Sequence, residues 1–133
     1  MYRIAILAER DEERSAYVDQ IAQFCHAKGL WPQIADYSDQ EQFFESVQRA
    51  APSNAVIALS GVAGLNAVEH LRALCPACGV IWYSDLDFSL QAFRLRANDF
   101  SLKPVSGERL RQGLTIWLEN RSCLPTQRND KTT

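Results

Sequence analysis

The sequence lacks several features that would assign it to a function class at once. Its formal net charge is only −2 at pH 7 and its sequence pI is about 5.6, so the domain has no positive field that would draw it onto nucleic acid or an anionic membrane. It has no glycine-rich phosphate loop, since Gly61 and Gly64 are isolated glycines. Its length of 133 residues, 47% of them hydrophobic, suits one domain with a substantial core and disfavours two independent domains.

The chain also begins without a secretory signal or a membrane span. A short apolar run over residues 1–7 changes abruptly into the charged residues 9–14, so we expect a cytoplasmic location. In a reducing compartment the cysteines are expected to be free thiols: Cys25, Cys75, Cys78 and Cys123. The Cys75-Pro-Ala-Cys78 pair falls on a helix-to-strand loop without further ligands nearby, so idle thiols are favoured over a zinc or redox site.

Short apolar runs alternate with longer amphipathic segments along the whole chain, which is typical of βα units around a parallel sheet. The third run, Ala55 to Leu59, is continuously apolar, as expected of a strand buried on both faces. Five strands are predicted, at Arg3 to Ala8, Trp31 to Tyr37, Asn54 to Leu59, Gly79 to Tyr83 and Asp99 to Leu102.

Helical periodicity fills the segments between these strands. The main helices are predicted at Asp11 to Lys28, around Phe43 to Val47, at Asn66 to Leu74, at Phe88 to Arg96 and at Ser106 to about Asn120. The polar end of the chain cannot pack against a core. We therefore expect a domain over residues 1–121 and a disordered tail or linker stub over residues 122–133.

Several of these features together resemble response-regulator receiver domains, over roughly Tyr2 to Asn120. They are the five βα rounds, an acidic turn after the first strand, the segment Gly64 to Glu69, and Phe100 to Val105 with its Lys-Pro pair. The stretch from Leu90 to Val105 is most similar to receivers that precede LytTR-type DNA-binding domains. The resemblance implies a flavodoxin-like (βα)5 α/β fold, with a parallel five-stranded sheet in the order 2-1-3-4-5 and helices on both faces.

A working receiver needs an acidic pair for Mg²⁺ after strand one, an aspartate nucleophile after strand three, a hydroxyl after strand four and a lysine after strand five. In this sequence the resemblance places these positions, in that order, on Ala8 and Glu9, on Leu59, on Tyr83 or Ser84, and on Lys103, with the aromatic switch on Phe100. A shift of one residue would move the nucleophile position from Leu59 to Ser60.

Neither Leu59 nor Ser60 is a carboxylate, so the sequence predicts that aspartyl phosphorylation fails at its central step. Ala8 and Leu59 also remove two expected oxygen ligands, which leaves Glu9 as a weak candidate ligand and implies weak Mg²⁺ binding at best. We therefore expect no cofactor and no catalytic residues.

Receivers usually report through the surface of helix four, strand five and helix five. In this sequence that region carries charged and polar residues of mixed sign, which suit either a partner or dimer interface or a solvated face: Asp87, Gln91, Arg94, Arg109 and Arg111.

These features predict a pseudo-receiver of a two-component system that acts by protein contact, as the N-terminal regulatory part of a DNA-binding transcription regulator, with no nucleic-acid or membrane contact of its own. The alternative is a flavodoxin-like module that binds a small ligand or nucleotide in the same crevice. A hydrolytic set of Ser60, Lys103 and Glu9 is disfavoured, because no histidine base falls at a strand end and no nucleophile elbow is present, so an enzyme is not expected.

Overall fold

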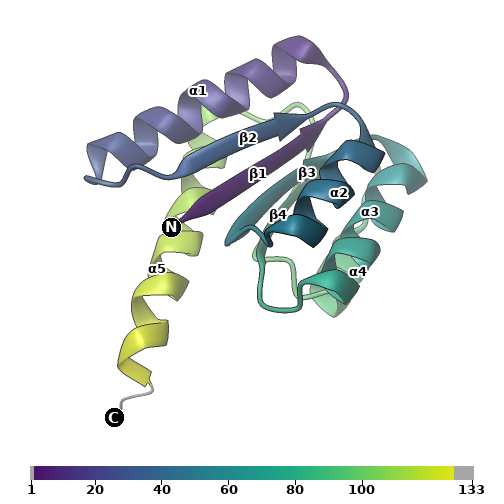
Figure 1. The fold of residues 1–133 in the computed structure, drawn as a ribbon. Coiled ribbons are helices and arrows are strands. Elements are labelled where there is room, and N and C mark those ends of the chain that lie inside the picture. The colour runs from purple at the N-terminus through teal and green to yellow at the C-terminus, as the bar shows by residue number, and fades with distance from the viewer. Residues whose placement is uncertain (1, 128–133) are drawn as a thin grey trace.

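A computed structural model describes the backbone of residues 2–127 and the side chains of residues 2–118, and strands and helices alternate along it (Figure 1). The strands are β1 (Arg3–Ala8), β2 (Gln33–Tyr37), β3 (Asn54–Ala58), β4 (Gly79–Ser84) and β5 (Asp99–Leu102). The helices are α1 (Asp11–Ala27), α2 (Gln40–Arg49), α3 (Gly61–Leu74), α4 (Ser89–Arg94) and α5 (Gly107–Gln127). Within this described part, no helix combines the length and the apolar character that crossing a membrane requires.

The five strands form one parallel sheet in the order β2-β1-β3-β4-β5. This confirms the predicted fold class. The order reverses at β1, which pairs with β2 on one side and with β3 on the other. The carboxyl ends of β1 and β3 therefore flank the point where open α/β sheets place their ligands.

Helices cover both faces of the sheet, because the central strands present apolar side chains to both faces. Ile57 and Leu59 belong to the core cluster under α2, α3 and α4, whereas Val56 and Ala58 belong to the cluster under α1 and α5. Every residue of β3 is buried, as its continuous apolar run predicts.

The start of α3 differs from its predicted start. The helix begins at Gly61, five residues before Asn66, because Gly64 is a packing residue and does not belong to a loop. A Cβ atom at Gly64 would lie 2.5 Å from the carbonyl oxygen of Leu59, so only glycine lets the first turn of α3 approach the end of β3 this closely.

The last two helices also differ in length from their predictions. The helix α4 ends at Arg94, and Arg96 follows in the left-handed region with φ 58°. The helix α5 continues to Gln127, past the expected domain end at Arg121 and through Pro125. Of the expected tail, residues 128–133 lie outside the described residues.

Candidate functional site

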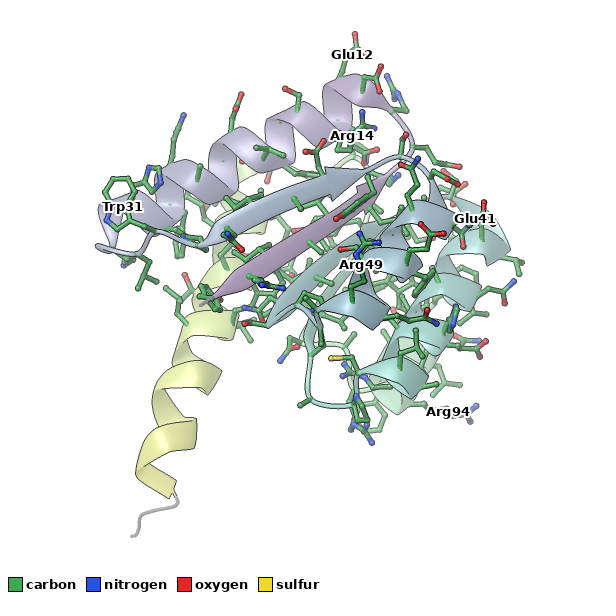
Figure 2. The ribbon with its side chains drawn as sticks, viewed as in Figure 1. Glu12, Arg14, Trp31, Glu41, Arg49 and Arg94 are labelled. Carbon is green, nitrogen blue, oxygen red and sulfur yellow. The ribbon has the colours of Figure 1, made fainter. Side chains whose placement is uncertain are left out.

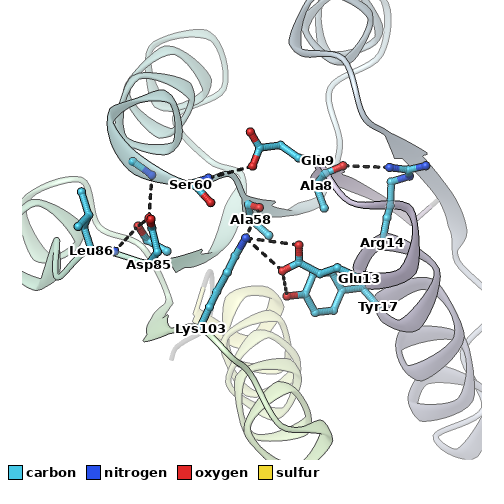
Figure 3. A network of polar contacts seen from close by, with 12 residues as sticks. Ala8, Glu9, Glu13, Arg14, Tyr17, Ala58, Ser60, Asp85, Leu86 and Lys103 are labelled. Carbon is cyan, nitrogen blue, oxygen red and sulfur yellow. Dashed lines mark hydrogen bonds and ion pairs between the residues drawn. The ribbon is translucent and has the colours of Figure 1, made fainter.

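The loops at the carboxyl edge of the sheet bring the predicted site positions together (Figure 3). Glu9 comes from the loop after β1, Ser60 from the loop after β3, Asp85 from the loop after β4, and Lys103 from the residue after β5. Polar contacts join these loops into one network. The network includes Glu9 and Lys103, which are 94 positions apart in the sequence. This network is the candidate functional site.

Leu59, at the predicted nucleophile position, is an apolar core residue. Its side chain is 2% exposed and belongs to the same cluster as Leu7, Ile57 and Trp82. Ser60 follows as the exposed N-cap of α3, and its side chain makes no capping hydrogen bond. The end of β3 therefore carries hydrocarbon and a neutral hydroxyl.

The two positions after β1 behave differently from each other. Ala8 is fully buried, and its carbonyl oxygen accepts a hydrogen bond from Nη1 of Arg14 at 3.0 Å. Glu9 is exposed, and its Oε1 accepts a hydrogen bond from the backbone N–H of Ser60 at 3.3 Å. The Glu9 carboxylate thus contacts the start of α3.

Asp85 makes the matching contact from the other side. Its Oδ1 accepts a hydrogen bond from the backbone N–H of Gly61 at 2.8 Å, and this bond is the main reason that the pKa of Asp85 lies below its ordinary value. The first N–H groups of a helix have no partner within the helix and carry its positive dipole end. Glu9 and Asp85 therefore satisfy two donors at the start of α3 with carboxylates of the chain itself.

Of the two hydroxyl candidates, Ser84 is the one that contacts this network. The Oγ of Ser84 accepts a hydrogen bond from the N–H of Leu86 at 3.1 Å and lies 3.5 Å from Oδ1 of Asp85. Tyr83 points to the other face of the sheet, where its ring lies 5.7 Å from that of Tyr17, and burial raises its pKa.

The side chain of Lys103 contacts a backbone carbonyl and a glutamate, and its described contacts involve no aspartate. Its Nζ donates a hydrogen bond to the carbonyl oxygen of Ala58 at 2.8 Å and lies 3.2 Å from Oε2 of Glu13. The side chains of Lys103 and Glu13 are only 18% and 16% exposed. The hydroxyl of Tyr17 donates to the same Glu13 carboxylate at 2.6 Å, and both its burial and this contact raise the pKa of Tyr17.

The sequence assigns neither Asp85 nor Glu13 a role at this site, although Asp85 follows the fourth strand directly. Glu13 belongs to an acidic first helical turn, which favours a helix wherever it occurs, so nothing local marks it as the partner of Lys103. The available signals were the four-residue spacing of Glu13 and Tyr17, which puts them on one face of α1, and the position of Asp85 directly after a strand.

Phe100, the predicted aromatic switch position, packs inward. Its ring meets the ring of Trp82 edge-on at 5.2 Å, and Trp82 in turn stacks on Phe88 at 5.3 Å. Trp82 is fully buried, and its Nε1 would lie 3.3 Å from a Cβ atom at Gly64, in the first turn of α3. Its fluorescence is therefore a natural reporter of changes at the site.

The residues present do not fit the Mg²⁺ ion that receivers bind. The resemblance places two oxygen ligands at Ala8 and Leu59, whose side chains are a methyl and an isobutyl group. Among the described residues, no three His, Cys, Asp or Glu side chains gather into a possible metal site. The carboxylates of Glu9 and Asp85 both already accept backbone hydrogen bonds.

Other candidate chemistry lies apart or is otherwise engaged. Lys103 pairs with Glu13, and Glu9 contacts the backbone N–H of Ser60, so neither of the two is hydrogen-bonded to the Ser60 hydroxyl within the described part of the chain. Cys75 and Cys78 are free thiols, and burial raises the pKa of Cys78 to about 12, which disfavours the reactive thiolate. Cys25 is a buried free thiol, and the side chain of Cys123 lies outside the described residues.

The expected interface residues differ in how freely they present their side chains. Asp87 accepts hydrogen bonds from the N–H and the hydroxyl of Ser89, and Arg109 pairs with Asp99 at 2.5 Å. Arg94 projects outward from α4 (Figure 2). Three exposed apolar side chains lie on the same elements: Leu90, Phe93 and Leu102, with exposed fractions of 56%, 81% and 49%.

No protein-family model matches the sequence, and no curated protein does. Solved structures match it over most of its length. The receiver domain of AraT, a response regulator from Geobacillus stearothermophilus, is 21% identical, with 91% of this chain and 96% of that one covered and a TM-score of 0.71. A LuxR-family two-component response regulator from Aurantimonas sp. SI85-9A1 is 20% identical, with 89% and 85% covered and a TM-score of 0.72.

The beryllofluoride-activated receiver domain of DrrB, a Thermotoga maritima protein, is 19% identical, with 90% of this chain and 98% of that one covered and a TM-score of 0.70. At these identities the similarity concerns the fold. The chain therefore has the fold of response-regulator receiver domains.

Proposed function

We propose that this chain is a cytoplasmic receiver-type domain of a two-component response regulator that signals by protein contact, without aspartyl phosphorylation. The observation that carries the proposal is the buried Leu59 at the end of β3 in a receiver fold. Phosphoryl transfer to a receiver needs a carboxylate to attack phosphorus, and a hydrocarbon side chain has no lone pair to do so.

The contacts of Lys103 support the same proposal. In a phosphorylated receiver a lysine and helix N–H groups would hold the oxygens of the phosphoryl group. Here Glu13 neutralises Lys103 at 3.2 Å, while Glu9 and Asp85 accept the hydrogen bonds from the first N–H groups of α3. Three carboxylates of the chain thus satisfy the donors that an incoming phosphate would need.

We place the interaction surface on α4, β5 and α5. The exposed side chains of Leu90, Phe93 and Leu102 offer apolar contact area, and Arg94 and Arg111 add positive charge at its margin. Protein interfaces combine such an apolar centre with a charged rim. The surface suits a second copy or a partner protein, including an output domain of a transcription regulator.

The decisive experiment combines Mg²⁺ with beryllofluoride, which mimics the phosphoryl group, and follows the melting temperature and the tryptophan fluorescence, to which Trp31, Trp82 and Trp117 all contribute. We expect neither to change, and we expect acetyl phosphate to leave the intact mass unchanged. In a double variant, Ala8→Asp with Leu59→Asp restores the two missing carboxylates and tests whether the assay detects a repaired site. A saturable, Mg²⁺-dependent response of the natural sequence would refute phosphorylation-independent signalling.

A second candidate function is the binding of a small ligand or nucleotide. It is favoured by a pocket of about 540 Å³ between α1 and the loop before α5, beside Lys103 and lined also by Arg10, Tyr17 and Gln20 and by the carboxylates of Glu12 and Glu13. That volume lies within the range of small-molecule sites, about 300–1,000 Å³. A thermal shift with flavin mononucleotide or a nucleoside phosphate, lost on Lys103→Met, would favour this function over the first.

A further inference from the structure

A second pocket lies at the opposite, amino-terminal edge of the sheet. It has a volume of about 350 Å³ and opens beside the first residues of β3 and β4. Half of its lining residues are polar or basic, and none of the lining residues carries a carboxylate; the polar and basic ones are Ser53, Asn54, Arg72, Arg96 and Asn98. This edge is remote in the fold from the network around Lys103.

The charge of Arg72 has no anionic partner among the described residues. Its guanidinium donates to the carbonyl oxygens of Leu95 at 2.9 Å, Cys78 at 2.7 Å, Pro76 at 2.9 Å and Arg96 at 3.1 Å, all of which are neutral acceptors. Partial burial, together with the nearby charge of Arg96, lowers the pKa of Arg72. Two positive charges therefore stand close together at the pocket.

Some of the other cations are paired, whereas Arg3, Lys28, Arg49, Arg94 and Arg111 form no ion pair with a carboxylate of the described residues either. Arg10, Arg14, Lys103 and Arg109 each form an ion pair with a carboxylate. In the part of the chain whose side chains are described, no such pair involves Arg72 or Arg96. The pocket is thus a local positive site in a domain whose net charge is −2.

The backbone of Arg96 adds an independent observation. Its φ of 58° lies in the left-handed region, where a side chain other than glycine is strained. The turn itself is held through the backbone, because the carbonyl oxygens of Leu95 and Arg96 accept hydrogen bonds from Arg72. The exposed Arg96 side chain makes no ion pair among the described residues, so its presence at a strained position is not explained by contacts within the domain.

We propose that this pocket binds a small molecule through an oxyanion, either a phosphate or a carboxylate group. The guanidinium of Arg96 supplies the main charge, and the remaining N–H of Arg72, the Asn98 side-chain nitrogen and the Ser53 hydroxyl supply donors. Asn98 is oriented for this task, because its Oδ1 already accepts a hydrogen bond from the N–H of Val80 at 2.7 Å. The pocket volume lies near the lower end of the range of small-molecule sites, about 300–1,000 Å³, so it suits a small ligand.

The test uses inorganic phosphate and succinate as probes, titrated separately at constant ionic strength. Backbone amide resonances of Gly79 and Asn98 report binding by NMR, and the melting temperature reports stability. We expect saturable shifts confined to the pocket with at least one probe, and the stronger probe identifies the oxyanion class. Absence of saturable shifts with both probes, or equal shifts with chloride, would overturn the proposal.

The variant Arg96→Gly separates ligand binding from folding. Glycine adopts a positive φ without strain, so the melting temperature should be at least as high as that of the natural sequence. Loss of the guanidinium should nevertheless weaken probe binding by about tenfold. The control Arg49→Ala removes the same charge from an exposed position of α2, outside the lining, and should leave affinity unchanged. Unchanged affinity in Arg96→Gly would overturn the assignment.

Discussion

At the scale of single residues, Glu13 is the carboxylate that forms an ion pair with Lys103 at the candidate site. Glu13→Gln keeps the shape of the side chain and removes its charge, so Lys103 loses its ion pair within a mostly buried environment. We expect urea denaturation to show a loss of about 1–2 kcal/mol in the free energy of unfolding, below the value for a fully buried pair. Glu12→Gln, at an 87% exposed side chain, should change it by less than about 0.5 kcal/mol; equal losses in the two variants would contradict this role.

The hydrogen bond between Asp85 and Gly61 should depend on pH. Its pKa is depressed mainly by the hydrogen bond from Gly61, so the contact is fully present above the ordinary pKa of 3.8 and is lost as pH falls through the lower folded value. The Gly61 amide resonance should therefore titrate with a midpoint below 3.8. Asp85→Asn should abolish that titration, whereas Asp87→Asn, whose carboxylate contacts Ser89, should preserve it. A Gly61 resonance that titrates normally in Asp85→Asn would show that another group controls it.

At the scale of elements, the contact between α3 and β3 depends on Gly64. A Cβ atom there would lie 2.5 Å from the Leu59 carbonyl oxygen, so Gly64→Ala must displace the helix from the strand. We expect this variant to lose about 1–3 kcal/mol of stability in chemical denaturation. Gly29→Ala has open space but a φ of 76°, and it should lose less, about 1 kcal/mol. A smaller loss for Gly64→Ala than for Gly29→Ala would mean that α3 shifts without strain.

The elements also show what sequence patterns can and cannot predict here. The apolar run of β3 and the periodicity of α1 are local signals, and the five-round order and the parallel sheet follow from them. The start of α3 was misplaced because Gly61 and Gly64 read as loop residues, although Gly64 serves a tertiary contact. The pairing of Glu13 with Lys103 spans 90 residues and has no local pattern at all.

At the scale of the whole molecule, the two edges of the sheet differ in charge and in contacts. The carboxyl edge holds carboxylates that are bonded to the chain itself, from Glu9, Glu13 and Asp85, whereas the amino edge holds Arg72 and Arg96 without an anionic partner among the described residues. A site already satisfied by its own carboxylates is poorly suited to receive a phosphate. The free surfaces of the domain, rather than that site, are therefore where regulation should act.

The apolar surface of α4 is the free surface on which self-association is most directly tested. Phe93 is 81% exposed, so Phe93→Ser removes no core contact and should leave the melting temperature unchanged while weakening association at least tenfold. Trp31→Ser is the matched control, because Trp31 is 72% exposed but follows α1 and precedes β2, at the opposite edge strand. Sedimentation equilibrium over a range of protein concentrations measures the self-association of both variants. If Trp31→Ser dissociates the assembly and Phe93→Ser does not, the interface lies on the β2 edge, and the surface of α4, β5 and α5 is not where this domain meets its copy.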